Sequence, residues 1–153
     1  MDHMKFFFLA AAFIFCLNAI AQKNEVIKDS AKTKTELFNK TLLWIGKTWG
    51  TNSGKVISLR DEVNGIIEVN GGLKAVPKTD GFAVKGQTNT TLRITVEDGR
   101  VELKFEHTSF KWEAGTVWNF EDDEGGAQKE KWKTDVADEI NELVASYKAD
   151  FGK

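Results

Sequence analysis

Apolar and charged residues alternate most clearly between Asn89 and Phe105. The apolar members of this alternation are Leu92, Ile94, Val96, Val101, Leu103 and Phe105. Asp98-Gly99 lies at its centre, and an Asp-Gly pair between alternating segments favours a two-residue hairpin loop. This loop sets Val96 opposite Val101 and aligns the remaining apolar residues on one face of the hairpin. The sequence therefore predicts a β-hairpin with one dry face and one charged face.

The second strand of this hairpin is predicted to continue to Trp112, but its alternation changes after Phe105. The large residues Phe110 and Trp112 are even-numbered, whereas the apolar residues before them are odd-numbered. Either a β-bulge at 107–109 shifts the pattern, or two aromatic side chains lie on the polar face. We favour the bulge, because bulges are common at strand ends.

Two segments have the three-and-four spacing of amphipathic helices. The first, Thr33 to Thr48, begins with a capping box of Thr33 and Glu36 and stops at Gly50. Its apolar face comprises Leu37, Phe38, Leu42, Trp44, Ile45 and Trp49. The second runs from Gln128 to Phe151, and its apolar face comprises Trp132, Val136, Ala137, Ile140, Leu143, Val144, Tyr147 and Phe151. Each helix needs an apolar surface to cover.

A second hairpin is predicted between Lys55 and Asn70. A three-residue loop at 63–65, with Gly65 left-handed, pairs Leu59 with Val69 and Arg60 with Glu68. We prefer this loop to a two-residue one because it gathers the aliphatic side chains of the hairpin on one face.

The remaining segments are less regular. Val26 and Ile27 indicate a short edge strand within 24–28, and residues 51–54 are predicted to form a loop. Asp80-Gly81 marks a turn, after which Phe82 and Val84 are expected to fold back onto the edge of the core. Residues 113–126 are predicted to form an acidic loop.

These elements follow the order β-α-β-β-β-β-α. Short connections make the middle strands antiparallel, and both amphipathic helices need the apolar face of the sheet. The fold class is therefore predicted to be α+β, a two-layer sandwich with two helices on one face of an antiparallel sheet. Residues 22–153 are expected to form this single domain.

Residues 1–21 resemble a secretory signal peptide. Lys5 supplies the positive charge, residues 6–17 are almost wholly apolar, and Ala19-Ile20-Ala21 is a small-x-small cleavage site. The apolar run is shorter than the roughly 20 residues of a membrane span. We expect cleavage after Ala21 and export to the periplasm or the cell exterior, with either Met1 or Met4 as the initiator.

Composition excludes several classes of chemistry. The only cysteine, Cys16, lies in the predicted signal peptide and follows Phe15, which argues against a lipid anchor. The mature chain therefore has no disulfide or thiol chemistry. The formal net charge is −2, whereas nucleic-acid-binding domains are usually basic on one face. The predicted open sheet face balances Arg60, Arg93, Arg100 and Lys104 against Glu68, Glu97, Glu102 and Glu106.

No catalytic, metal or cofactor site is expected. His107 is the only histidine after the predicted cleavage site, and Ser109 alone does not complete a triad with it. The acidic run 121–124 lacks the alternating spacing of a calcium loop and is better interpreted as a solvated turn before a helix. The triplet Asp29-Ser30-Ala31 resembles a bacterial O-glycosylation acceptor, although a plain turn is the simpler interpretation.

A cluster of aromatic residues is the main candidate for ligand binding: Phe110, Trp112, Trp118 and Phe120. All four fall close together in sequence at one end of the predicted sheet. They can line a groove for a glycan, a peptide or an apolar ligand. They can equally close the open end of the core beneath Trp132, and this second interpretation is favoured.

The capped helix TKTELFNKTLLWIGKTW and the segments RDEVNGIIEVNG and TLRITVEDGRVELKFEHTSF carry a family resemblance. Together with the signal peptide, they resemble a bacterial secreted family known as domain of unknown function 4468, over about residues 24–112. The resemblance implies a fold like that of the TATA-box-binding protein (TBP). It implies no catalytic residues, and fold alone does not assign DNA binding.

Two functions fit these observations. The first is a non-enzymatic binding or interaction module of the cell envelope, whose partner is a protein, a glycan or a small molecule. The second is a small carrier of apolar ligands, with a cavity between the C-terminal helix and the sheet. A cavity under Trp132 and Tyr147 would favour the carrier, and an exposed patch of Trp112 and Trp118 would favour the module.

Overall fold

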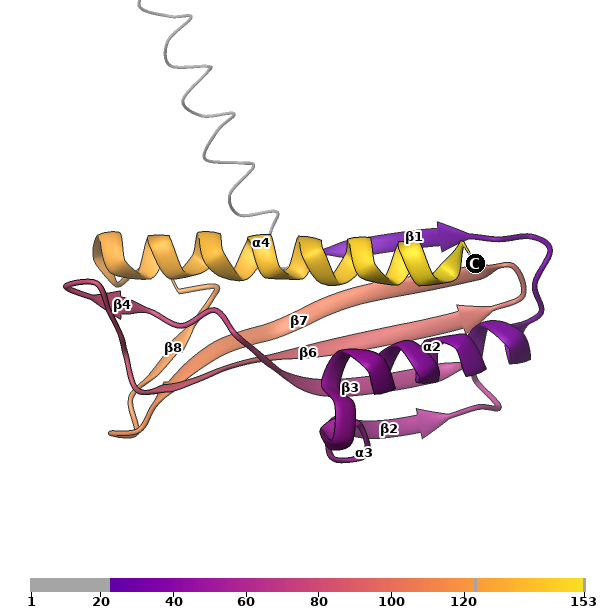
Figure 1. The fold of residues 1–153 in the computed structure, drawn as a ribbon, viewed down its shortest axis with the longest axis horizontal. Coiled ribbons are helices and arrows are strands. Elements are labelled where there is room, and N and C mark those ends of the chain that lie inside the picture. The colour runs from indigo at the N-terminus through magenta and orange to yellow at the C-terminus, as the bar shows by residue number, and fades with distance from the viewer. Residues whose placement is uncertain (1–22, 123, 153) are drawn as a thin grey trace, which may run out of the picture.

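The computed structural model describes residues 23–122 and 124–152. The predicted signal peptide therefore lies outside the described residues. Within them a curved antiparallel sheet is covered on one face by two helices (Figure 1). The strand order is β1-β7-β6-β3-β2, and β8 pairs with β7. The α+β two-layer architecture predicted from the sequence is confirmed.

The two longest strands, β6 (Gly86–Glu97) and β7 (Arg100–Trp112), form the predicted central hairpin. Its register is the predicted one, with Val96 opposite Val101 and Leu92 opposite Phe105. Gly99 has a φ of 68°. The neighbouring Asp98 carboxylate accepts a hydrogen bond of 2.7 Å from the backbone N–H of Lys34. The hairpin tip is thereby joined to the start of the first helix.

The outer strands complete the sheet. The short edge strand predicted within 24–28 is present as β1 (Asn24–Lys28), which pairs antiparallel with β7, and β3 (Ile66–Leu73) pairs with β6. The other edge is β2 (Ile57–Asp61). A separate small hairpin consists of β4 (Lys78–Thr79) and β5 (Phe82–Ala83), and β8 is Val117–Asn119.

The long helices bury the stripes that the sequence indicated. Helix α2 (Lys34–Trp49) has the predicted Thr33–Glu36 capping box and ends at Gly50, whose φ is 57°. Helix α4 (Gly126–Phe151) runs along the length of the long strands (Figure 1). The buried residues of α4 are Lys129, Trp132, Val136, Ala137, Ile140, Val144, Tyr147 and Phe151. Residues 51–54 were wrongly predicted as a loop. They continue through the 3-10 turn η1 (Gly50–Asn52) into α3 (Ser53–Val56).

The predicted β2–β3 register is wrong by one residue. Leu59 pairs with Glu68 and Arg60 with Ile67, around a four-residue loop at 62–65. The Asp61 carboxylate closes this loop by accepting a 2.9 Å hydrogen bond from the Asn64 backbone N–H. The hydrogen bonding of Asp61 to Asn64 therefore determines the loop length, even though this register leaves Leu59 exposed.

The slip exchanges the faces of two side chains, as the period of two in a strand requires. Leu59 is 41% exposed, whereas Arg60 lies on the helix side with its guanidinium 5.9 Å from the centre of the Phe38 ring. Arg60 thus does not belong to the open face on which we predicted it. A bulge between Ile57 and Leu59 returns Ile57 to the face of Ile67.

The open face carries paired charges. Arg93 lies 3.8 Å from Glu68, and Arg100 lies 3.0 Å from Glu97 and 2.8 Å from Glu102. Lys104 pairs with Glu106, and this hydrogen bond lowers the pKa of the Glu106 carboxyl. The predicted charge balance on this face is present as individual ion pairs, apart from Arg60.

One buried hydrogen bond links the two helices. The hydroxyl oxygens of Thr41 in α2 and Tyr147 in α4 are 2.8 Å apart. Burial raises the pKa of Tyr147 from its ordinary 10.0 to about 12, because the charged phenolate would lose its hydration.

The chain contains one tyrosine, so its ionisation can be followed by ultraviolet absorbance. We expect an apparent pKa of about 12 in the folded protein and about 10 in the unfolded protein. The unfolded state then loses its proton first, so the contribution of Tyr147 to the free energy of unfolding is constant below pH 10 and falls between those two values. A folded-state pKa near 10 would show that water reaches the phenol.

Candidate functional site

A β-bulge determines which side chains of β7 reach the aromatic end. Thr90 of β6 faces both His107 and Thr108, because the ladder shifts between Asn89 and Thr91. His107 is the extra residue of the bulge, and its φ is 49°. The Thr90 and Thr108 hydroxyls are 2.9 Å apart on the helix side. The predicted bulge is confirmed, and it turns Phe110 towards the helices.

The strand β8 was not predicted from the sequence, and it folds back against β7 after a short turn. Phe110 pairs with Trp118 and Lys111 with Val117. Gly115, with a φ of 95°, lies in the turn, where the Trp112 backbone N–H donates to the Thr116 carbonyl at 2.9 Å. The expected acidic loop is therefore a hairpin over its first half.

All four predicted aromatic residues belong to one cluster, in which three of the rings pack against Trp132 of α4 and Trp112 packs on Phe110 and Trp118. The ring centres of Phe110, Trp118 and Phe120 lie 6.3, 6.3 and 6.0 Å from that of Trp132. Phe110 and Trp132 are fully buried, and Phe120 is 5% exposed. Gly86 permits this packing, because a Cβ there would lie 2.5 Å from the Phe110 ring. These inner rings extend the hydrophobic core to the end of the sheet.

The other two rings form an outer pair. Trp112 and Trp118 are partly exposed, and their ring centres lie 5.3 Å apart at an interplanar angle of 81°. This is the edge-to-face geometry that aromatic pairs prefer. We call Trp112 and Trp118 the outer tryptophan pair. The predicted cluster thus divides into two core residues and two partly exposed residues.

The outer tryptophan pair holds an unpaired hydrogen-bond donor. The Trp112 indole N–H is buried and has no acceptor among the described residues. Buried donors in proteins almost always have a partner, since leaving one unpaired costs about 1–3 kcal/mol. By comparison, the indole N–H of Trp132 donates to the Thr88 hydroxyl at 3.1 Å.

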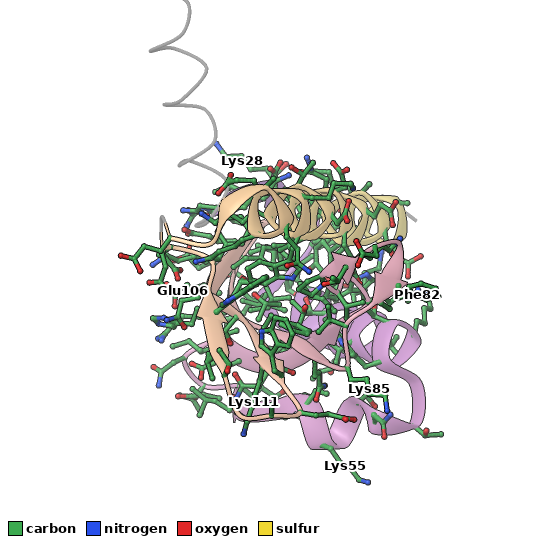
Figure 2. The ribbon with its side chains drawn as sticks, turned by 90° about the vertical axis from the view of Figure 1, so that its left-hand side faces the viewer. Lys28, Lys55, Phe82, Lys85, Glu106 and Lys111 are labelled. Carbon is green, nitrogen blue, oxygen red and sulfur yellow. The ribbon has the colours of Figure 1, made fainter. Side chains whose placement is uncertain are left out.

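Two exposed apolar side chains lie near this end. Val117 is 48% exposed, and Phe82 is 78% exposed rather than folded onto the core as we predicted. Phe82 turns outward because the two-residue strands of the β4–β5 hairpin pair with each other and not with the main sheet. Figure 2 views the molecule from this end, with Phe82, Lys85 and Lys111 at its rim.

Two lysines of α4 donate hydrogen bonds to backbone carbonyls of Asp122 and Glu124. Lys129 is 1% exposed, and its ammonium donates to the Glu124 carbonyl at 2.8 Å. Lys133 donates to the Asp122 carbonyl at 3.0 Å. Sequence reasoning missed Lys129, although it lies three residues before Trp132 on the apolar stripe. In the described part of the chain no three His, Cys, Asp or Glu side chains are grouped as metal ligands.

A groove of about 770 Å³ lies beside α4, and the sequence did not indicate it. Trp49 and the end of β3 form one wall, and the charged flank of α4 forms the other. Glu139 from that flank accepts hydrogen bonds of 2.8 Å from the backbone N–H groups of Lys74 and Ala75. The groove therefore flanks the helix and does not lie beneath its buried face.

The segment from residue 24 to residue 111 matches the model of a family described as a domain of unknown function (DUF4468) with TBP-like fold. The chain belongs to this family. A DUF4468 family protein from Bacteroides ovatus has a similar solved structure, with a TM-score of 0.71 and 15% identity over 86% of each chain.

A TBP-like protein from Parabacteroides distasonis also resembles this DUF4468 domain. Its TM-score is 0.59 at 14% identity, over 83% of this chain and 92% of the other. At these identities the likeness concerns the fold alone. A comparison with curated proteins gave no match. Among the described residues of the DUF4468 domain, no helix is both long enough and apolar enough to cross a membrane.

Proposed function

We propose that this DUF4468 domain is a non-enzymatic binding module of the cell envelope, and that it binds a protein partner through the outer tryptophan pair. The observation that carries the proposal is the edge-to-face pair of Trp112 and Trp118, whose rings are both partly exposed in the isolated domain. A partner surface that packs on this pair covers the exposed parts of both rings. Tryptophan is enriched in the energetically dominant positions of protein interfaces.

Export to the periplasm or the cell exterior is part of the proposal. It is supported by the signal-like residues 1–21 and by a mature sequence without cysteine, which folds without redox chemistry. The ion-paired open face argues against a nucleic-acid partner, because phosphate binding needs uncompensated positive charge.

The alternative role as an apolar-ligand carrier receives less support. The α4 residues that face the sheet, among them Trp132, Val136 and Ile140, are buried within the core cluster. The groove of about 770 Å³ beside α4 is lined largely by charged side chains, and a second groove of about 250 Å³, between α2 and the end of α4, includes Lys40, Lys47 and Asp150 in its lining. An apolar cargo would find neither an enclosed nor an uncharged site in them.

Capture from an envelope extract tests the proposal. The mature domain is immobilised as wild type, as Trp112→Ala/Trp118→Ala, and as Trp49→Ala, the last being a partly exposed tryptophan remote in sequence from the pair. We expect one protein to be retained by the wild type and Trp49→Ala but not by the double variant. Retention of the same proteins by all three would contradict the proposal.

A further inference from the structure

We propose that Ser30 is a modification site, at which its hydroxyl receives an O-linked glycan. The site requires the export proposed above but not the outer tryptophan pair. Asp29-Ser30-Ala31 is the only place in the sequence where a serine or threonine follows an aspartate. The triplet forms the exposed turn between β1 and α2.

Hydrogen bonds on both sides of Ser30 fix this turn. The Asp29 N–H donates to the Gly99 carbonyl at 2.8 Å, and the Gly99 N–H donates to the Lys32 carbonyl at 2.9 Å. The Lys32 N–H closes the turn onto the Asp29 carbonyl at 3.1 Å. Residues 30 and 31 therefore project from a rigid base at the tip of the central hairpin.

The Ser30 hydroxyl is free to react. Ser30 is exposed, and no hydrogen bond of its hydroxyl occurs among the described residues. The nearby Thr33 hydroxyl, by contrast, bonds to Glu36 at 2.9 Å within the capping box. A hollow of about 380 Å³ adjoins Ser30, and Lys32, Asp98 and Gly99 also line it. This hollow offers room and polar partners for the first sugar.

The Asp29 carboxylate is held in one position beside this hydroxyl. It accepts a 3.3 Å hydrogen bond from the Ala31 N–H and lies 2.7 Å from the Lys32 ammonium. The hydrogen bond from the Lys32 side chain is the main reason that the pKa of Asp29 is lowered. A transferase thus meets a carboxylate that is fixed by its ion pair with Lys32, one residue before the acceptor.

The reaction is a glycosyl transfer from a donor sugar activated by phosphate. The Ser30 oxygen forms a bond to the anomeric carbon, and the bond from that carbon to the phosphate oxygen breaks. The phosphate leaves with the bonding electron pair, and the hydroxyl proton passes to a base of the transferase. No oxidant or reductant takes part.

The location leaves the proposed binding surface open. The turn lies at the end of the sheet occupied by the tip of the β6–β7 hairpin, whereas β8 and the start of α4 lie at the opposite end (Figure 1). A glycan on Ser30 is therefore directed away from Trp112 and Trp118.

The test uses the full-length chain expressed in its native bacterium. Protein recovered from the envelope and the medium is digested after glutamate, which releases Ser30 in the segment 26–36. Mass spectrometry is expected to show this segment heavier by one or more sugar residues, and electron-based fragmentation to place the addition on Ser30. The N-terminus of the same sample reports whether cleavage follows Ala21.

Variants separate the acceptor from its surroundings. Ser30→Ala and Asp29→Asn are expected to abolish the added mass, and Ser30→Thr to keep it. Ser58→Ala, which removes another exposed serine that follows no aspartate, is expected to keep it as well. An unmodified segment in the exported wild-type protein, an addition that persists in Ser30→Ala, or a chain that is not exported would overturn the proposal.

Discussion

Replacing Trp132 with alanine is expected to lower the free energy of unfolding by about 3–5 kcal/mol. The indole is fully buried and lies at the centre of the aromatic end, in contact with Phe110, Trp118 and Phe120. Its removal leaves a cavity that three packed rings cannot fill, and it breaks the bond to Thr88. Equilibrium unfolding in urea, followed by circular dichroism, measures the loss.

Trp49→Ala is the matched control for this substitution. Trp49 is only partly buried, and it meets Trp44 edge-on at 5.7 Å. Less apolar area is lost on truncation, so the destabilisation is expected to be clearly smaller than for Trp132. Equal losses in the two variants would show that the aromatic end is not part of the cooperative core.

Gly65→Ala is expected to cost about 2–5 kcal/mol, although it adds a single methyl group. Gly65 has a φ of 69°, which non-glycine residues adopt only with strain. Its carbonyl accepts a 2.7 Å hydrogen bond from Val96. A Cβ at this position would overlap the carbonyl oxygen of Val96, so the β2–β3 loop would have to leave the sheet.

Gly81→Ala measures the cost of the backbone conformation at a position where the added Cβ overlaps no other atom. Gly81 has a φ of 82°, but a Cβ there would meet no heavy atom within 4 Å. We expect a loss of at most about 1–2 kcal/mol from the backbone conformation alone. If urea unfolding gives the same loss for both variants, contact with Val96 plays no part at Gly65.

The elements that were predicted correctly are those whose signals lie within a few residues of one another. Asp98-Gly99 fixed the register of β6 and β7, and Thr33 with Glu36 fixed the start of α2. In each case one turn or one cap determines the geometry. Because α2 and α4 each have an apolar stripe and the predicted sheet has one apolar face, both helices were predicted to pack on that face.

The wrong predictions concern segments whose structure depends on residues distant in sequence or on competing interactions. Asp61 bonds to Asn64 and lengthens a loop that we had predicted from burial alone, and Leu59 and Arg60 exchange faces as a result. Phe82 is exposed because its small hairpin pairs only with itself. No periodicity in so short a strand as β8 distinguishes it from a loop.

The sequence predicted that four aromatic residues would cluster, but it did not predict which of their rings would be exposed. The sequence brought Phe110, Trp112, Trp118 and Phe120 to one end, and the structure places them around Trp132. Which rings are buried depends on the pairing of β8 with β7. The unpaired N–H of Trp112 and the buried Lys129 depend on contacts that no spacing encodes.

The bulge at His107 makes this part of the chain more sensitive to length than to composition. The His107 side chain is exposed, so other residues that tolerate a positive φ, such as asparagine or glycine, can replace it at little cost. Deleting the residue would instead invert every later position of β7 and carry Phe110, with Trp118 opposite it, to the solvent face. The number of residues in this segment therefore constrains the fold more than the identity of the bulged residue does.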